Sequence, residues 1–212
     1  LDVARVQQEG LVHDRRFMVA RPDGVFVTAR KYPVLQTITA CFDGAQLSLL
    51  HDDYPAVADS VAQFERQHFA TRVWADDFAA WTTTQRLDAW VSRLVGEPVH
   101  LLWLGEQSSR FLDTIGVRVS FADGYPLLLI SEASLADLNA RTDGSHVMAQ
   151  FRPNVVVRDT DAFAEDAGPR PAVLPAGSRR SLPSRWEWRG GRRGEYRPDG
   201  ELLQPRFRRD RG

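Results

Sequence analysis

Apolar and polar residues alternate along the opening part of the chain, which is the pattern of half-buried β-strands rather than of helices. Two stretches, RRFMVARPDGVFVTAR (15–30) and LQTITACFDGAQLSLL (35–50), each place a turn between two alternating arms. The turns are Pro22-Asp23-Gly24 and Asp43-Gly44, where glycine allows the positive φ of a tight turn. Two hairpins this close together predict a meander or a small barrel.

The period changes in the stretch 83–95, TTQRLDAWVSRLV, which predicts an amphipathic helix. Gly96 and Pro98 follow as stop signals. A buried strand is predicted for PVHLLWL (98–104), and a loop for FLDTIGVRVSFADG (111–124). The predicted helix places four apolar residues on one face, at Leu87, Trp90, Val91 and Leu94.

A short apolar strand, PLLLI (126–130), runs directly into SEASLADLN (131–139), which reads as a helix. Ser131 and Ser134 are both good N-cap residues. A strand that feeds a helix N-terminus leaves free backbone N–H groups at the positive end of the helix dipole. This junction is therefore a candidate anion site.

The motif FRPNVVV (151–157) places an arginine before a proline and an asparagine after it, at the entry to an apolar strand. Proline disfavours the helical region for the residue before it, so we expect Arg152 to be extended. Arg152 and Asn154 would then present a guanidinium and an amide in fixed relative positions.

These features suggest an anion pocket, because the planar arginine fork donates two parallel hydrogen bonds to a phosphate. Its candidate members are Arg15, Arg30, Arg152, Asn154 and the N–H groups near Ser131 and Ser134. The alternative is that Asp14, Arg15 and Arg16 form a solvated hairpin edge and that Arg152 caps a strand at the surface. Separately, Glu165-Asp166 follows Phe163 and is a candidate for pinning a loop to the barrel.

The composition, with 43% hydrophobic and 26% charged residues, is that of an ordinary globular protein. The single cysteine, Cys41, excludes an internal disulfide and a cysteine-based zinc site, and predicts a cytoplasmic location. No apolar run reaches the roughly 20 residues of a membrane helix, so we expect no membrane partner. Residues 167–212 carry twelve arginines against five acids, which makes nucleic acid a weaker alternative partner.

Several of these motifs, in this order, resemble the two-part arrangement of MOSC proteins. The stretch 10–35, GLVHDRRFMVARPDGVFVTARKYPVL, resembles the β-barrel domain that precedes MOSC domains. The stretches 121–139 and 151–166 resemble the MOSC domain itself, named after the C-terminal domain of molybdenum cofactor sulfurase. The whole is similar to bacterial MOSC iron–sulfur proteins and mitochondrial amidoxime-reducing components.

The resemblance implies a β-rich α/β fold with few helices. It would comprise a MOSC N-terminal β-barrel-like domain (1–104) and a MOSC β-barrel domain (105–212). It also implies that the molybdenum cofactor, molybdopterin, binds between several motifs. The pyridoxal phosphate association holds for the domain family only. The implied cofactor-binding residues are Arg15, Thr28, Arg30, Ser131, Ser134, Arg152, Asn154 and Ser184.

The sequence departs from the family pattern at two places. A Y-P-[VI]-K-S type motif would precede Leu1, and a C-S-R-C motif, whose second cysteine ligates molybdenum, would lie near 184–187. Here the local sequence reads PSRWEW (183–188), with Ser184 and Arg185 recognisable and Trp186 where a thiolate is wanted. We expect the chain to be truncated at both ends and divergent or frame-shifted around 167–190.

The function implied by the resemblance is that of a molybdenum-cofactor-dependent oxidoreductase acting on small N-hydroxylated compounds. A separate flavin or iron–sulfur reductase would donate the electrons. Without the thiolate we expect catalysis to fail as the sequence is written, and we assign no metal-ligating or catalytic residue. The alternative is a catalytically dead module that binds or carries the cofactor.

Overall fold

The computed structural model describes residues 3–112, 116–142 and 144–167, and three strands between residues 186 and 203. The chain forms two compact units. Unit 2 is His13–Gly124, and unit 1 combines Leu1–Val12 with Tyr125–Gly212.

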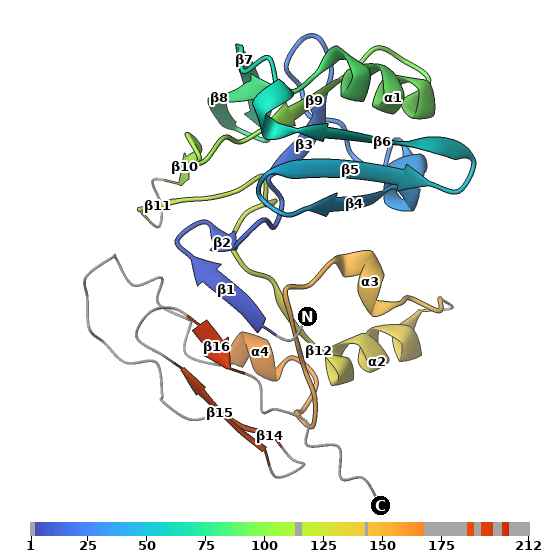
Figure 1. Ribbon diagram of the computed structural model, residues 1–212. Helices are drawn as coiled ribbons and strands as arrows, with labels where there is room; N and C mark the ends of the chain where they lie inside the picture. The colour runs from blue at the N-terminus through green and yellow to red at the C-terminus, as the bar shows by residue number, and fades with distance from the viewer. Residues whose placement is uncertain are drawn as a thin grey trace, which may run out of the picture. The chain divides into compact units, whose positions relative to one another are not determined.

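Unit 2 contains two antiparallel sheets (Figure 1). One has the strand order β3-β9-β8-β7 and the other β4-β5-β6. Their strands are β3 (Phe17–Ala20), β4 (Thr39–Phe42), β5 (Gln46–His51), β6 (Tyr54–Ser60), β7 (His68–Val73), β8 (Asp76–Thr82) and β9 (His100–Trp103). The shorter elements are the 3-10 turns η1 (Pro33–Thr37) and η2 (Val61–Gln63) and the hairpin β10 (Phe111–Leu112) and β11 (Val117–Arg118).

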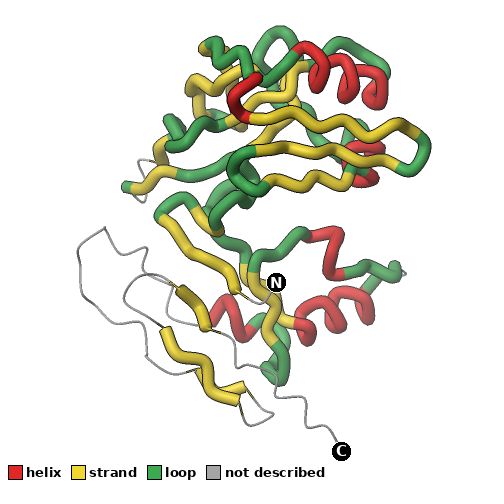
Figure 2. Tube along the Cα trace, in the orientation of Figure 1, coloured by secondary structure: helices red, strands yellow, loops and turns green. Residues whose placement is uncertain are grey.

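One helix, α1 (Gln85–Val95), packs on β9 and β6 and covers the core of unit 2 (Figure 2). Its N-cap is Thr84, whose Oγ1 accepts from the Leu87 N–H at 3.2 Å. Gly96 ends it in the left-handed region with φ 81°. Each large apolar side chain buried in such a core contributes about 1.5–3 kcal/mol to stability. The buried core residues are Val27, Leu47, Leu49, Val57, Val61, Phe64, Leu87, Val91, Val95, Val99, Leu101 and Trp103.

Unit 1 holds a parallel strand pair, with helices both between its two strands and after them. Its described elements are β1 (Val3–Gln7), β2 (Gly10–Leu11), β12 (Leu129–Ser131), α2 (Glu132–Arg141), α3 (Met148–Phe151), β13 (Val155–Val157), α4 (Ala164–Ala167), β14 (Trp186–Trp188), β15 (Arg192–Tyr196) and β16 (Glu201–Leu203). The last three strands join β1 and β2 in a sheet of order β14-β15-β16-β1-β2. In the other pair, β12 runs parallel to β13, with Leu129 opposite Val155 and Ser131 opposite Val157.

The β-rich class with few helices is confirmed, and so are the hairpin at Asp43-Gly44 and the helix that ends at Gly96. The first hairpin forms its turn, since the Gly24 N–H donates to Arg21 O at 2.9 Å. The prediction of a full second arm is wrong, because Val25 and Phe26 make only isolated bridges. The arm ends where the Thr28 carbonyl accepts from two N–H groups and closes a turn. The predicted boundary between residues 104 and 105 stays a prediction.

The loop predicted for residues 111–124 contains the short β10–β11 hairpin, with Phe111 opposite Arg118. Within the described ranges, no helix has both the length and the apolar character needed to cross a bilayer.

Two glycines of unit 2 provide a matched test of backbone conformation and steric fit. Gly24 has φ +83° and an added Cβ would lie 2.4 Å from Ala70 O, whereas Gly96 has φ +81° and open space. We expect Gly96→Ala to lower the free energy of unfolding by about 1–2 kcal/mol, the cost of left-handed backbone. Gly24→Ala should cost clearly more, because its Cβ also overlaps a carbonyl. Urea unfolding of both variants measures the difference, and equal losses would contradict the close approach at Gly24.

Candidate functional site

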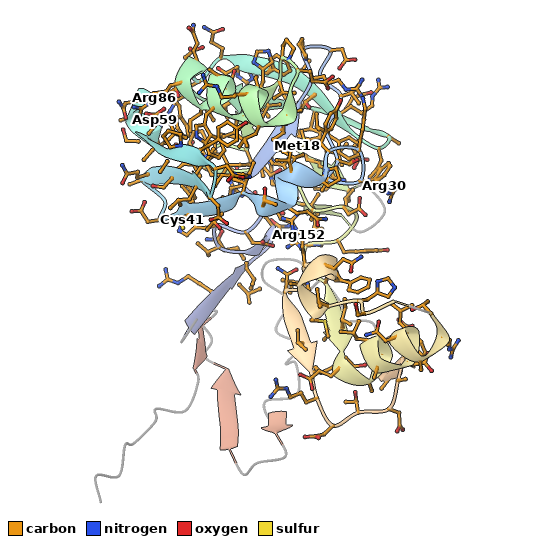
Figure 3. All side chains as sticks on the ribbon, turned by 90° about the vertical axis from the view of Figure 1, so that its right-hand side faces the viewer. Met18, Arg30, Cys41, Asp59, Arg86 and Arg152 are labelled. Atoms are coloured by element: carbon orange, nitrogen blue, oxygen red, sulfur yellow. The ribbon has the colours of Figure 1, made fainter. Side chains whose placement is uncertain are left out.

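Arg152 lies where α3 ends and the chain turns into β13, and it is labelled in Figure 3. Its backbone is left-handed, with φ 53° and ψ 47°, and its N–H donates to Ala149 O at 3.1 Å. The prediction of an extended Arg152 is therefore wrong. Pro153 disfavours the right-handed region, as expected, but the chain satisfies that restriction by capping the helix in the left-handed one.

Left-handed backbone at a non-glycine residue costs about 1–2 kcal/mol and is concentrated at ligand sites. Among the residues predicted to bind the cofactor, Arg152 and Arg15 have this conformation, with φ 53° and 49°. Both are arginines, so in each case an unfavourable backbone geometry carries a fork-shaped cationic side chain.

Asn154 fastens the start of β13 to the residue that precedes β12. Its Oδ1 accepts from the Leu128 N–H at 2.9 Å, and its own N–H donates to Leu128 O at 2.8 Å. The predicted amide is thus fixed in position, but its oxygen is bonded to the backbone of its own unit. Asn154 has a structural role whatever else it binds.

The junction of β12 and α2 forms as predicted, with Ser131 as the N-cap. Ser131 Oγ accepts from the Ser134 N–H at 2.9 Å. A carboxylate from farther along the chain occupies the same place, as Glu165 Oε1 accepts from the Ser131 N–H at 3.0 Å and from Ser134 Oγ at 2.6 Å. The donors that the sequence assigned to an external anion therefore bind an internal one.

Counting protons fixes the direction of each hydrogen bond in this cluster. Ser134 has one hydroxyl proton, and it goes to Glu165, so the 2.6 Å contact between the two serine hydroxyls must be donated by Ser131. Ser134 Oγ also accepts from the Phe163 N–H at 2.8 Å. Both serines are buried, with Ser131 0% exposed, and every hydroxyl is satisfied. We call Ser131, Ser134, Phe163 and Glu165 the α2 anchor.

The α2 anchor shifts the acidity of Glu165. Partial desolvation acts to raise the pKa, but hydrogen bonds from Ser134 Oγ, the Ser131 N–H and its own N–H outweigh it and lower the pKa of Glu165 to about 2. The carboxylate is therefore ionised at any physiological pH, next to the positive end of the α2 dipole.

The remaining predicted residues lie in unit 2 or outside the described chain. Arg15 forms an ion pair with Asp14, and its side chain is only 12% exposed. Arg16 is buried and donates to Gly105 O, so the alternative of a solvated edge at residues 14–16 is wrong. Arg30 is exposed in the turn that follows Thr28.

The structure thus brings Ser131 and Ser134 into one cluster and ties Asn154 to β12 in the same unit. Ser184 lies outside the described residues. Glu165 was predicted to pin a loop to the barrel, whereas it lies in α4 and bonds to the junction of β12 and α2, a position that the sequence did not indicate. A lone acidic residue more than thirty positions from its partners gives no local signal of this kind.

The described residues contain no cluster of three or more His, Cys, Asp or Glu side chains suited to a metal. The one cysteine, Cys41, is exposed on β4 in unit 2, where Figure 3 labels it.

Comparison with known families finds two matches along the chain. The MOSC N-terminal beta barrel domain matches residues 1–98, and the MOSC domain matches residues 116–173. The chain carries both domains of a MOSC protein. The second match spans the α2 anchor, Arg152 and Asn154.

Curated relatives align with about three quarters of the chain. Mitochondrial amidoxime-reducing component 1 of Danio rerio is 28% identical over 166 residues, covering 74% of this chain and 51% of that protein. The component 1 of Homo sapiens is 30% identical over 170 residues, covering 76% and 50%. Molybdenum cofactor sulfurase of Oryza sativa subsp. japonica is 25% identical over 181 residues, covering 74% and 22%. The chain spans about half the length of the amidoxime-reducing components it matches.

The lowered pKa of Glu165 predicts how stability depends on pH. Its folded pKa lies below the model-compound value of 4.5, so its contribution is fully present above pH 4.5 and is lost as pH falls toward 2. At pH 7, we expect Glu165→Gln to lower the free energy of unfolding by about 1–3 kcal/mol, as charge-assisted hydrogen bonds are lost.

The difference between wild type and Glu165→Gln should shrink between pH 4.5 and 2, since wild-type Glu165 then becomes protonated. Urea unfolding of both proteins across this pH range measures the difference. The contributions of the other carboxylates are the same in both proteins and cancel. A difference that stays constant down to pH 2.5 would contradict the assigned pKa.

Proposed function

We propose that this chain binds the molybdenum cofactor, molybdopterin, through its MOSC domain and is of the oxidoreductase type. The observation that carries the proposal is the pair of MOSC matches, together with the similarity to relatives named for amidoxime reduction and for the molybdenum cofactor. By that analogy, the substrate is a small N-hydroxylated compound.

The binding of the pterin phosphate is assigned to Arg152. Phosphate recognition needs a cationic fork held in a defined direction, because two parallel N–H···O bonds form only in one geometry. The left-handed backbone of Arg152 and the ring of Pro153 restrict that direction. Asn154, two residues on, is fixed to β12 through Leu128, so the strand that carries the motif has a defined start.

Arg15, Thr28, Arg30 and Ser184 remain candidates for the same ligand on the strength of the resemblance. Ser131 and Ser134 are weaker candidates, because their donors already bind Glu165. When bound, the cofactor would supply the redox chemistry, and these residues would bind and orient it. Electrons would come from a separate flavin or iron–sulfur reductase.

The chemistry of the donor set favours a second candidate, a module that binds or carries the cofactor without turnover. The sequence has one cysteine, Cys41, which is exposed on β4 of unit 2. Trp186 stands where the resemblance puts the ligating cysteine, and an indole cannot replace a thiolate at a soft metal.

Purification of the full chain from cells that make the cofactor tests both candidates. Molybdenum content and the fluorescence of the oxidised pterin measure binding, and reduction of an amidoxime with a chemical reductant measures turnover. We expect retained pterin without turnover. Turnover would contradict the candidate function of a carrier module, and absence of pterin would contradict the proposal as a whole.

Arg152 provides the sharpest mutational test of binding. Each charge-assisted hydrogen bond contributes about 1.5–3 kcal/mol, so Arg152→Ala should lower pterin retention by about tenfold or more. Arg152→Lys should recover only part of it, because an ammonium lacks the bidentate geometry. Pterin fluorescence per mole of purified protein is the measurement.

Arg158 serves as the matched control, since it follows the other end of β13 and its exposed side chain pairs with Glu132 at 2.7 Å. Arg158→Ala should change retention by less than about twofold, as exposed pairs contribute little. Equal retention in wild type, Arg152→Ala and Arg152→Lys would show that Arg152 belongs to the scaffold.

A further inference from the structure

The parallel pair β12–β13 is too short to fix its own alignment. Each strand has three residues, and among the described strands the two pair only with each other. An isolated two-stranded pair is marginal in water, and a slip of one residue would turn every side chain to the opposite face. Side-chain contacts at the ends of the pair must therefore supply what the ladder lacks.

One such contact links the starts of the two strands, and a second ties the end of β12 to α4, the helix that follows β13. Before β12, the side chain of Asn154 holds the backbone of Leu128. At the other end, Glu165 holds the N–H of Ser131, the last residue of β12. The exposed pair of Arg158 and Glu132 lies at the same end and adds little, being open to solvent.

We propose that Glu165 is a positioning residue, a built-in anion that occupies the N-terminus of α2 and ties the end of β12 to α4, the helix that follows β13. Through that connection it also fixes the entry to β13, where Arg152 lies. Only this last step rests on the proposed function. The carboxylate uses the donors that an external phosphate would need, so a phosphate can bind at Ser131 and Ser134 only by displacing Glu165.

The surroundings of the second carboxylate oxygen of Glu165 explain why its contribution depends on its charge as well as on its shape. Its Oε2 is buried and has no hydrogen-bond partner within the described part of the chain. A glutamine that keeps the acceptor at Oε1 would put an amide NH₂ at that position, a buried donor without an acceptor. Glu165→Gln is therefore not a silent replacement.

Chemical rescue tests the proposal without reference to the cofactor. Glu165→Ala leaves the N-terminus of α2 without its anion and should lower Tm by roughly 3–10 °C at pH 7. Formate should restore part of that loss when compared with chloride at equal ionic strength. Wild type, Glu165→Gln and the neighbouring Asp166→Ala should not respond to formate.

Two results would overturn the proposal. One is a Tm of Glu165→Ala equal to that of wild type. The other is a rise in the wild-type Tm with formate as large as the rise in Glu165→Ala, which would show that the helix end is open to external anions.

Ser134→Ala is the milder variant, used if Glu165→Ala does not fold. It removes one donor to Glu165, and amide exchange at Val155–Val157 should become about tenfold faster. Exchange at Leu47 and Leu49 in unit 2 should not change and serves as the internal control. Unchanged exchange at Val155–Val157 would overturn the proposal.

The link between Glu165 and Arg152 is tested separately, with pterin retention as the measurement. If the wild type retains pterin and Glu165→Ala does not, the positioning role is supported. Equal retention in the two proteins overturns that role. A wild type that never retains pterin would contradict the proposed function while the formate result still decides the role of Glu165.

Discussion

A strand of three residues cannot determine its own register, and this constraint governs the part of unit 1 that carries Arg152. The ladder of β12 and β13 is only three residue pairs long. The alignment therefore depends on side chains that reach across from outside the ladder, Asn154 at one end and Glu165 at the other. The positions of helix α2 and of the start of β13 both depend on where these two side chains hold β12.

The same device recurs in unit 2, although the two units are otherwise built differently. There Asp59, at the end of β6, accepts from Thr84 Oγ1 at the N-terminus of α1 and also forms an ion pair with Arg86 (Figure 3). Among the described helices, the two longest thus each begin at a serine or threonine cap that also contacts a carboxylate distant in the sequence. In unit 2 a large apolar core supports the arrangement. In unit 1 the strand pair is small, so the carboxylate has more influence.

Local patterns in the sequence predicted the elements that local forces determine. The hairpin at Asp43-Gly44 and the helix from Thr84 to Gly96 follow from turn and capping residues within a few positions, and both formed. The extended Arg152 was wrong because a neighbour-based rule excludes one backbone region without choosing between the others. The identity of the anion at Ser131 could not be predicted either, because Glu165 lies 34 positions away.

Hydrogen exchange of the full chain with and without molybdopterin tests the central claim most directly. That claim is that the cofactor binds at Arg152 while Glu165 keeps its hydrogen bonds to the N-terminus of α2. We predict slower exchange in the segment 149–155 with cofactor present, and unchanged exchange at Ser131, Ser134 and residues 163–166. Protection at Ser131 and Ser134 with faster exchange at residues 163–166 would mean that the cofactor displaces Glu165 and would contradict the account. No protection in either segment would contradict it as well.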